Sequence, residues 1–276
     1  MTGDTTNNIR LLFVDLDGTL LNSDSEITPN SLVAVEQCTK AGISVVMATA
    51  RPPRSSKAYY EQLKLDTPSI HYNGAIVHDF ATGSTLLHHP MSGALAKELS
   101  ERAIEIDASA IISLEVSDNW YMNRRSEDLL TRTEREGFAP DHVGDLEPYF
   151  DEPVTKVLIS FPKTSVDDAE ARLSTRLGER LVFTRSEEWL LQVMDAGVSK
   201  GAAAEFMMKT LGVRRDKVAA IGDAPNDIPM FDAARLSIAM ANGYAEVRSA
   251  ADHVTLSNDE DGVAVAIRKW ILDANR

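Results

Sequence analysis

The sequence predicts an α/β protein built on a doubly wound parallel sheet, with a second, α+β domain inserted into it. Near both ends of the 276-residue chain, apolar runs typical of strands buried on both faces of a parallel sheet alternate with helical segments. The middle holds shorter, less apolar strands, typical of an antiparallel sheet. We therefore expect a core domain from residues 1–82 and 189–276, and an inserted domain from residues 83–188.

The first part of the core has a β-α-β-α-β order, which favours a parallel sheet because such crossovers connect parallel neighbours. Thr28 and Pro29 have the pattern of a helix N-cap followed by proline at the first helical position. Gly42 has the position of a residue that ends that helix. The expected strands cover 9–14, 43–48 and 69–72, and the expected helices cover 29–41 and 55–65.

The pattern of buried strands returns after the insertion. A helix that begins at Lys200 is ended by Gly212, and a short helix follows Asn226. The other expected elements are strands over 218–221, 236–240 and 253–256 and a helix over 263–272.

The inserted domain carries no pattern of residues that indicates a particular ligand. The alternating run over 111–116 predicts a half-exposed strand. Adjacent His88 and His89 lack metal-ligand spacing and are expected in a solvated loop. An aromatic and basic group (Trp120, Tyr121, Arg124, Arg125) is more typical of domain packing and solvent than of a substrate-reading patch. Further elements are expected as strands over 155–161, 181–184 and 190–194 and a helix over 166–177.

Composition excludes several classes of function. The net charge is −14, from 28 basic and 42 acidic residues, which disfavours nucleic acid and anionic membranes as partners. No apolar run is long enough to span a bilayer, and the polar N-terminus lacks a secretory signal. The single cysteine, Cys38, excludes an internal disulfide and is expected in the core. A cytoplasmic monomer or small homo-oligomer fits these features.

Four polar clusters follow expected strands or begin a helix, at the sheet edge where ligands bind in open α/β folds. They are Asp15-Leu-Asp17-Gly-Thr-Leu, Thr49-Ala50-Arg51, Lys200, and the run Gly-Asp223-Ala-Pro-Asn226-Asp227. Several carboxylates at one small site are costly unless a cation joins them, and hard oxygen ligands suit Mg²⁺. A carboxylate can then attack phosphorus, and a second carboxyl can transfer the proton.

The clusters match, in order, the four motifs of the haloacid dehalogenase (HAD) superfamily of phosphohydrolases, which this chain resembles over essentially its whole length. The large insertion between the second and third motifs is similar to that of the Cof-type sugar-phosphate phosphatases. Further matches are Asn-Gly-Ala at 73–75, Gly-Val-Ser-Lys-Gly at 197–201 and Ala-Met-Ala-Asn-Gly at 239–243.

The resemblance implies roles for particular residues. It makes Asp15 the nucleophile and Asp17 the general acid/base. A Mg²⁺ ion would be held by Asp15 and Asp223 and by the backbone carbonyl of Asp17. The remaining implied site residues are Thr49, Ala50, Lys200 and Asn226 for the phosphoryl group, with Asp227, Arg51 and Asn73 in support. The family usually has glycine where this chain has Ala50, and the added methyl bears on the backbone contact expected there.

Taken singly, these residues have ordinary alternatives. Asp15 and Asp17 are also turn formers, and Lys200 is also typical of a solvated helix start. Thr49 is also a common N-cap residue, and Asp227 also suits a helix N-terminus. Arg51 is equally typical of the surface.

The function that follows is a Mg²⁺-dependent phosphatase that hydrolyses a small, sugar phosphate-like phosphomonoester through an aspartyl-phosphate, with the inserted domain as a cap over the site. A sugar phosphomutase on the same core is the alternative. A phosphorylatable receiver domain is half as long and lacks the paired acid, and dinucleotide and P-loop motifs are absent. The expected partner is a small phosphorylated metabolite, whose identity the sequence leaves open.

Overall fold

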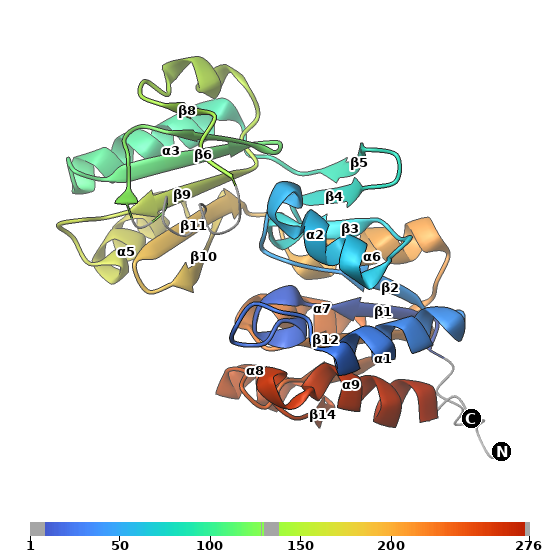
Figure 1. The fold of residues 1–276 in the computed structure, drawn as a ribbon. Helices are drawn as coiled ribbons and strands as arrows, with labels where there is room; N and C mark the ends of the chain where they lie inside the picture. The colour runs from blue at the N-terminus through green and yellow to red at the C-terminus, as the bar shows by residue number, and fades with distance from the viewer. Residues whose placement is uncertain (1–8, 128, 130–137, 274–276) are drawn as a thin grey trace. The chain divides into compact units, whose positions relative to one another are not determined.

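The chain folds into two compact units in a computed structural model that describes residues 9–127, 129 and 138–273 (Figure 1). The first unit comprises Met1–Arg51, Ser56–Leu86 and Ser199–Arg276. The second comprises Pro52–Ser55 and Leu87–Val198. The insertion therefore begins close to the expected residue 83 but extends past the expected 188.

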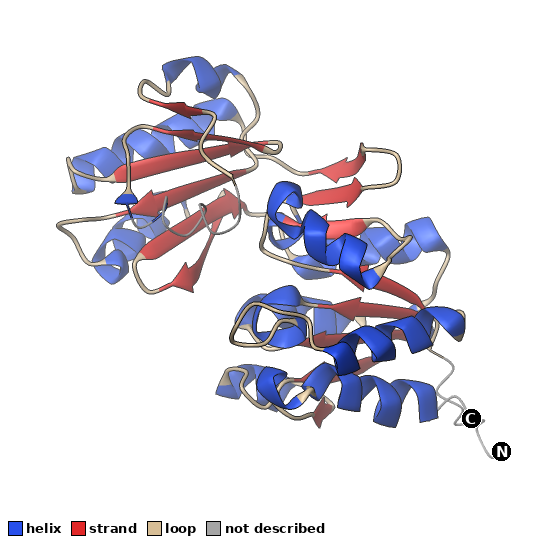
Figure 2. Cartoon of the chain, viewed as in Figure 1, coloured by secondary structure: helices blue, strands red, loops and turns tan. Residues whose placement is uncertain are grey.

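The first unit is built on a parallel sheet with the strand order β14-β13-β12-β1-β2, and the predicted doubly wound fold is confirmed (Figure 2). β1 lies between β2 and β12, although β12 follows it only after the whole insertion. The strands are β1 Leu11–Val14, β2 Ser44–Met47, β12 Val218–Gly222, β13 Leu236–Ala239 and β14 His253–Val254.

Helices flank this sheet and close its core. α1 packs against α9, and α6 packs against α7. The apolar side of α1 includes Cys38, which is buried as expected, and burial raises the pKa of its thiol to about 12. The helices are α1 Pro29–Lys40, α2 Pro53–Leu63, α6 Lys200–Leu211, α7 Ile228–Ala233, α8 Ala245–Ala250 and α9 Gly262–Ala266, continued by a turn over Ile267–Leu272.

The helix ends follow the capping signals in the sequence. The hydroxyl of Thr28 accepts a hydrogen bond from the Ser31 amide, with Pro29 at the first helical position. Gly42 follows α1 with a φ of 76°, and Gly212 ends α6 with a φ of 66°. The side chain of Ser199 caps α6 and so fixes the helix start at Lys200.

A small sheet of order β3-β4-β5 adjoins the parallel sheet through a bridge between Ala48 and Ile70. Its strands are β3 Ser69–His71, β4 Ile76–Asp79 and β5 Ser84–His88. Only β3 was expected, because the polar run over 78–84 offers no clear strand pattern. The expected loop residue His88 instead ends β5, where it is half-buried and its Nε2 lies 2.9 Å from the Thr155 hydroxyl.

The second unit is the α+β insertion, whose sheet has the order β10-β11-β9-β6-β7-β8. Its neighbouring strands are antiparallel except for β7 and β8. α3 Gly93–Ile106 and α5 Val166–Leu177 pack against each other over its apolar residues. The strands are β6 Ile111–Val116, β7 Asn119–Met122, β8 His142–Val143, β9 Lys156–Ser160, β10 Leu181–Glu187 and β11 Leu190–Asp195.

Two expectations for this unit need correction. β6 is not half-exposed, since all its residues after Ile111 are buried. On its polar side, the Ser113 hydroxyl accepts a hydrogen bond from the indole of Trp120, and Glu115 forms an ion pair with Arg54. The second concerns the boundary: β11, the strand expected over 190–194, lies past the expected end of the insertion at 188 but pairs with β9 and β10 and so belongs to this sheet.

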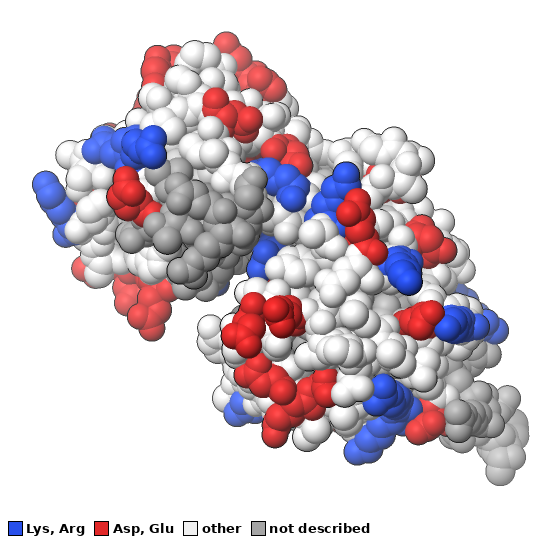
Figure 3. Space-filling view, in the orientation of Figure 1, with Lys and Arg blue, Asp and Glu red and all other residues white. Residues whose placement is uncertain are grey.

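The described surface carries both signs of charge. On the face shown in Figure 3, lysines and arginines occur as separate small groups and not as one continuous basic area, in line with the net charge of −14. Within the described ranges, no helix has the length and hydrophobicity that crossing a bilayer requires.

Candidate active site

Asp15 directly follows β1, which lies in the middle of the parallel sheet. Its amide donates to the carbonyl of Ile221 on β12, so the strand pairing fixes its backbone. The chain then makes a tight turn in which Gly18 has a φ of 75°. A Cβ on Gly18 would lie 2.5 Å from the Asp223 carboxylate, so only glycine lets the turn approach Asp223 this closely.

A buried ion cluster joins three of the sequence motifs. The Nζ of Lys200 lies 2.6 Å from one oxygen of Asp15 and 2.6 Å from one oxygen of Asp227. The side chains of Lys200, Asp15 and Asp227 are 1%, 6% and 0% exposed. The sequence alternative of a solvated Lys200 is therefore wrong, and its position at the start of α6 directs it into the site.

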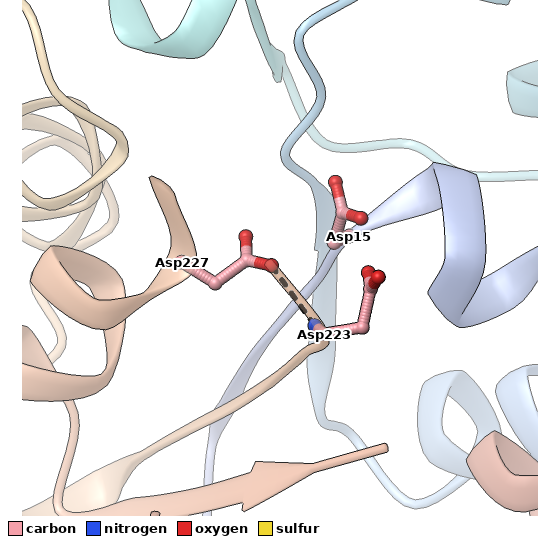
Figure 4. Close-up of side chains that lie close together, drawn as sticks. All are labelled: Asp15, Asp223 and Asp227. Atoms are coloured by element: carbon pink, nitrogen blue, oxygen red, sulfur yellow. Dashed lines mark hydrogen bonds between the residues drawn. The ribbon is translucent and has the colours of Figure 1, made fainter. Parts of the chain in front are cut away.

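Asp227 is held by the backbone of its own loop. Its Oδ2 accepts a hydrogen bond of 3.0 Å from the amide of Asp223 (Figure 4) and another of 3.0 Å from the amide of Ala224. Its Oδ1 faces Lys200. Both of its oxygens are thus occupied by the protein. This arrangement suits a residue that orients Lys200 and shapes the loop of Asp223.

Three carboxylates, those of Asp15, Asp223 and Asp227, each offer an oxygen, and these oxygens lie within 4.8 Å of one another (Figure 4). Burial raises the pKa of Asp15 well above its ordinary value, Lys200 opposes this, and the two other carboxylates add to it. Burial, together with Asp227, also raises the pKa of Asp223 to about 6. Three carboxylates beside one ammonium leave the cluster with a net negative charge. A hard divalent cation held by Asp15 and Asp223 can balance this charge.

Lys200 stays charged in this setting. Burial alone would lower the pKa of its ammonium, but the charges and hydrogen bonds of Asp15 and Asp227 outweigh burial and raise it above its ordinary value. A permanent cation at this point can hold an anionic ligand next to Asp15.

Asp17 lies apart from the cluster in a pair with Arg51. The guanidinium donates from Nε and Nη2 to both carboxylate oxygens, at 2.6–3.1 Å. The Asp17 side chain is 50% exposed, whereas that of Arg51 is 10% exposed and lies over the Tyr59 ring. Arg51 is thus not a free surface residue, and it fixes the direction of the Asp17 carboxylate.

The second motif and the fourth motif meet through the turn after β3. The amide of Asn73 donates to the Thr49 carbonyl at 3.1 Å. The Nδ2 of Asn226 donates to the Asn73 Oδ1 at 2.8 Å. Thr49 is fully buried, and its hydroxyl oxygen accepts from the Arg51 amide, which leaves the hydroxyl proton for an acceptor. Ala50, between them, is half-buried.

Two residues of the site were not assigned roles from the sequence. The Thr19 hydroxyl donates to the Asp223 Oδ1 at 2.8 Å, and the Asn242 Nδ2 donates to the Gly18 carbonyl at 2.8 Å. Thr19 belongs to the first motif, and Asn242 belongs to the run over 239–243. The family motifs therefore already included both residues. Their contacts tie the turn of Gly18 to Asp223.

Comparison with known proteins agrees with this geometry. The profile of the haloacid dehalogenase-like hydrolases matches residues 12–267, nearly the whole chain. The chain belongs to this family. The HAD-like hydrolase is also similar to a 5-amino-6-(5-phospho-D-ribitylamino)uracil phosphatase of Bacillus subtilis, with 31% identity over 265 residues that cover 94% of this chain and 97% of the relative.

Solved structures of HAD-like proteins have the same fold. A haloacid dehalogenase-like hydrolase from Bacteroides thetaiotaomicron is 27% identical, with a TM-score of 0.83 over 95% of this chain and 99% of that one. A phosphatase of the haloalkanoate superfamily from the same organism is 26% identical, with a TM-score of 0.83 and 97% of each chain covered. The family expected from the four motifs is therefore confirmed.

Proposed function

We propose that this HAD-like hydrolase is a Mg²⁺-dependent phosphatase that hydrolyses small phosphomonoesters through an aspartyl-phosphate. The observation that carries the proposal is the buried cluster of Asp15, Lys200 and Asp227 beside Asp223, where strand ends bring a nucleophile, a fixed cation and metal ligands together. The phosphatase names of the relatives support the same reaction.

Asp15 and Asp17 have different roles in the reaction: Asp15 is the nucleophile, and Asp17 is the general acid and base. An Asp15 oxygen forms a bond to phosphorus while the bond from phosphorus to the leaving oxygen breaks, and Asp17 gives its proton to that oxygen. Asp17 then takes a proton from water as the water oxygen attacks phosphorus, and the bond to Asp15 breaks to release inorganic phosphate. Arg51 orients Asp17 by its two-pronged contact.

The other site residues bind and orient the phosphoryl group. Lys200 offers its ammonium beside Asp15, and Asp227 holds Lys200 in place. Thr49 can donate its hydroxyl proton, Ala50 can donate its amide, and Asn226 can contribute its side-chain amide. Mg²⁺, held by Asp15, Asp223 and the carbonyl of Asp17, would neutralise charge on the phosphoryl oxygens when bound.

The second unit acts in this proposal as the cap that selects the leaving group, and the substrate is a small phosphorylated metabolite. Three relatives in Bacillus subtilis carry the name 5-amino-6-(5-phospho-D-ribitylamino)uracil phosphatase, so a phosphorylated polyol is a natural first substrate to examine. The single, buried cysteine fits a reducing, cytoplasmic location.

The test is phosphate release from a panel of phosphomonoesters, measured with Mg²⁺ and with chelator. The panel includes hexose and pentose phosphates, phosphoglycolate, pyridoxal phosphate, flavin mononucleotide and the phosphoribitylaminouracil named above. The proposal requires metal-dependent release that Asp15→Asn abolishes, because this change removes the nucleophile. Lys64→Gly, an exposed site at the end of α2, is the control and should retain full turnover. Phosphate transfer to a sugar without release would contradict hydrolysis and indicate a mutase.

A further inference from the structure

The turn that follows β3 has a strained backbone. Three successive residues, Tyr72, Asn73 and Gly74, have φ values of 51°, 58° and 106°. Asparagine and glycine tolerate this left-handed region, whereas a buried tyrosine rarely adopts it. Such strain persists only where the surroundings hold it, and it often marks a functional site.

Contacts to two motif segments hold the turn in place. The amide of Tyr72 donates to the Arg51 carbonyl, and the amide of Asn73 donates to the Thr49 carbonyl. The turn is therefore hydrogen-bonded to the second motif on both sides of Ala50. A Cβ on Gly74 would lie 2.2 Å from the carbonyl oxygen of Ser199, the residue before Lys200. The backbone of the turn therefore fits closely between the second and third motifs.

The Asn73 side chain reaches the fourth motif. It is buried, with 4% of its surface exposed, and its Oδ1 accepts from the Asn226 Nδ2 at 2.8 Å. The Asn226 Oδ1 is also buried but has no hydrogen-bond partner among the described residues. A buried amide oxygen without a partner is costly and marks a place where a donor, such as a water that accompanies a ligand, completes the contacts. The second N–H of Asn226 is the group that can donate to a phosphoryl oxygen.

We propose that Asn73 is a positioning residue that fixes the side-chain amide of Asn226 toward the phosphoryl group. The inference rests on the proposed function, since it takes Asn226 as a phosphate contact. A planar amide held at one end by Asn73 cannot turn freely, so its remaining N–H and its carbonyl oxygen keep fixed directions. Binding then orders fewer groups, and the affinity for the phosphoryl group is higher.

A purely structural role for Asn73 would rest on its left-handed backbone alone. The two roles differ in one respect that can be measured. Replacement by glycine keeps the left-handed backbone accessible but removes the acceptor for Asn226. The structural role predicts no loss of phosphate affinity from this change, and the positioning role predicts a loss that depends on the presence of the Asn226 side chain.

The experiment measures binding of inorganic phosphate by calorimetry in the presence of Mg²⁺. We expect Asn73→Gly to weaken binding about tenfold, the usual scale for one hydrogen bond. Asn226→Ala should weaken it at least as much, and the double variant should bind no more weakly than Asn226→Ala alone, because Asn73 acts through Asn226. Lys64→Gly, which changes another left-handed residue of the same unit, should bind as the wild type does.

A second readout does not depend on phosphate. The side-chain NH₂ resonances of Asn226 in an NMR spectrum should shift in Asn73→Gly, and they should stay near their wild-type values in Asn73→Asp, which keeps the acceptor oxygen and tolerates the backbone. If Asn73→Gly folds poorly, Asn73→Asp still tests the inference, because shifted Asn226 resonances in this variant, which keeps the acceptor, would contradict it. The inference is overturned if the Asn226 resonances do not shift in Asn73→Gly. It is also overturned if the double variant binds phosphate more weakly than Asn226→Ala by the factor that Asn73→Gly shows alone.

The two proposals fail in different ways. A wild-type protein that binds no inorganic phosphate with Mg²⁺ would refute the proposed function and this inference together. A wild-type protein that binds phosphate normally, with Asn73→Gly binding equally well, would refute only the positioning role.

Discussion

Both units of the molecule bury charged side chains, but the balance of charge differs between them. In the described part of the first unit, Lys200 is the one ammonium in contact with the carboxylates of Asp15 and Asp227, and Asp223 is close by. In the second unit, Arg54 pairs with Glu115 and Asp118. There Lys156, the neighbour of Glu115 across the sheet, adds a second cation.

The difference separates a site prepared for ligands from one that holds the fold together. Burial raises the pKa of Asp15 and Asp223, which means that the cluster of the first unit lacks positive charge by itself. Among the described residues, the group in the second unit has two cations, Arg54 and Lys156, beside two carboxylates, and Lys156 also donates to Gln192. Changes in the first group should therefore alter reaction and metal binding, and changes in the second should alter stability.

Apart from the loss of the nucleophile itself in Asp15→Asn, the largest effect on function is expected from Asp17→Asn. Loss of a general acid/base typically slows turnover by about 10²–10⁴-fold. Because Asp17 is half-exposed and lies apart from the buried cluster in a pair with Arg51, the fold should be little affected. The measurement is kcat for the preferred substrate beside the thermal unfolding temperature. A normal rate would move the proton transfer to another group.

The matching change in the second unit is Glu115→Gln. Leaving Arg54 without its buried partner should lower the free energy of unfolding by about 1–3 kcal/mol, less than for a fully buried pair because Arg54 is partly exposed. Chemical denaturation measures this loss. Inorganic phosphate should bind as in the wild type, and an unchanged stability would show that the balanced group is not structural.

The smallest effect is a gain. Asp223→Asn should stabilise the metal-free protein by about 1–2 kcal/mol at pH 7.5, because a carboxylate with a pKa of about 6 is ionised there against its surroundings. The pKa of Asp223 is higher in the folded protein than in the unfolded chain. The protonated carboxyl therefore adds to the free energy of unfolding below a pH of about 4, and this stabilisation is lost as the pH rises through about 6. The gain should therefore vanish at pH 4.

The same variant tests the metal site. Mg²⁺ should raise the unfolding temperature of the wild type at pH 7.5, since a ligand that binds only the folded state stabilises it. Asp223→Asn should respond much less. An equal response in both proteins would place the metal elsewhere and break the contrast between the two units.

The parallel sheet and most of the site could be predicted from the sequence because the signals are local. Apolar runs end at Asp15 and before Asp223, and parallel strands bring their carboxyl ends to one edge. The start of α6 at Lys200 follows from the Ser199 cap. Each of these needs only a few neighbouring residues.

What the sequence left open depends on contacts between distant segments. The pairing of Arg51 with Asp17 and of Asn73 with Asn226 joins residues whose spacing carries no pattern. β6 alternates like a half-exposed strand but is buried, because Trp120 and Arg54 cover its polar side. α3 was missed for a different reason: its signals are local, since Ser92 caps it and Ala96, Leu99 and Ala103 form a buried stripe.

The discontinuous sheet also has a consequence during synthesis. β1 pairs with β2 early, but its other neighbour, β12, begins 204 residues after Val14, at Val218. At about 5–20 residues per second, the ribosome releases β12 at least about ten seconds after β1. During that interval an apolar strand edge has no partner of its own and is open to pairing with other chains, and slow translation would prolong the exposure.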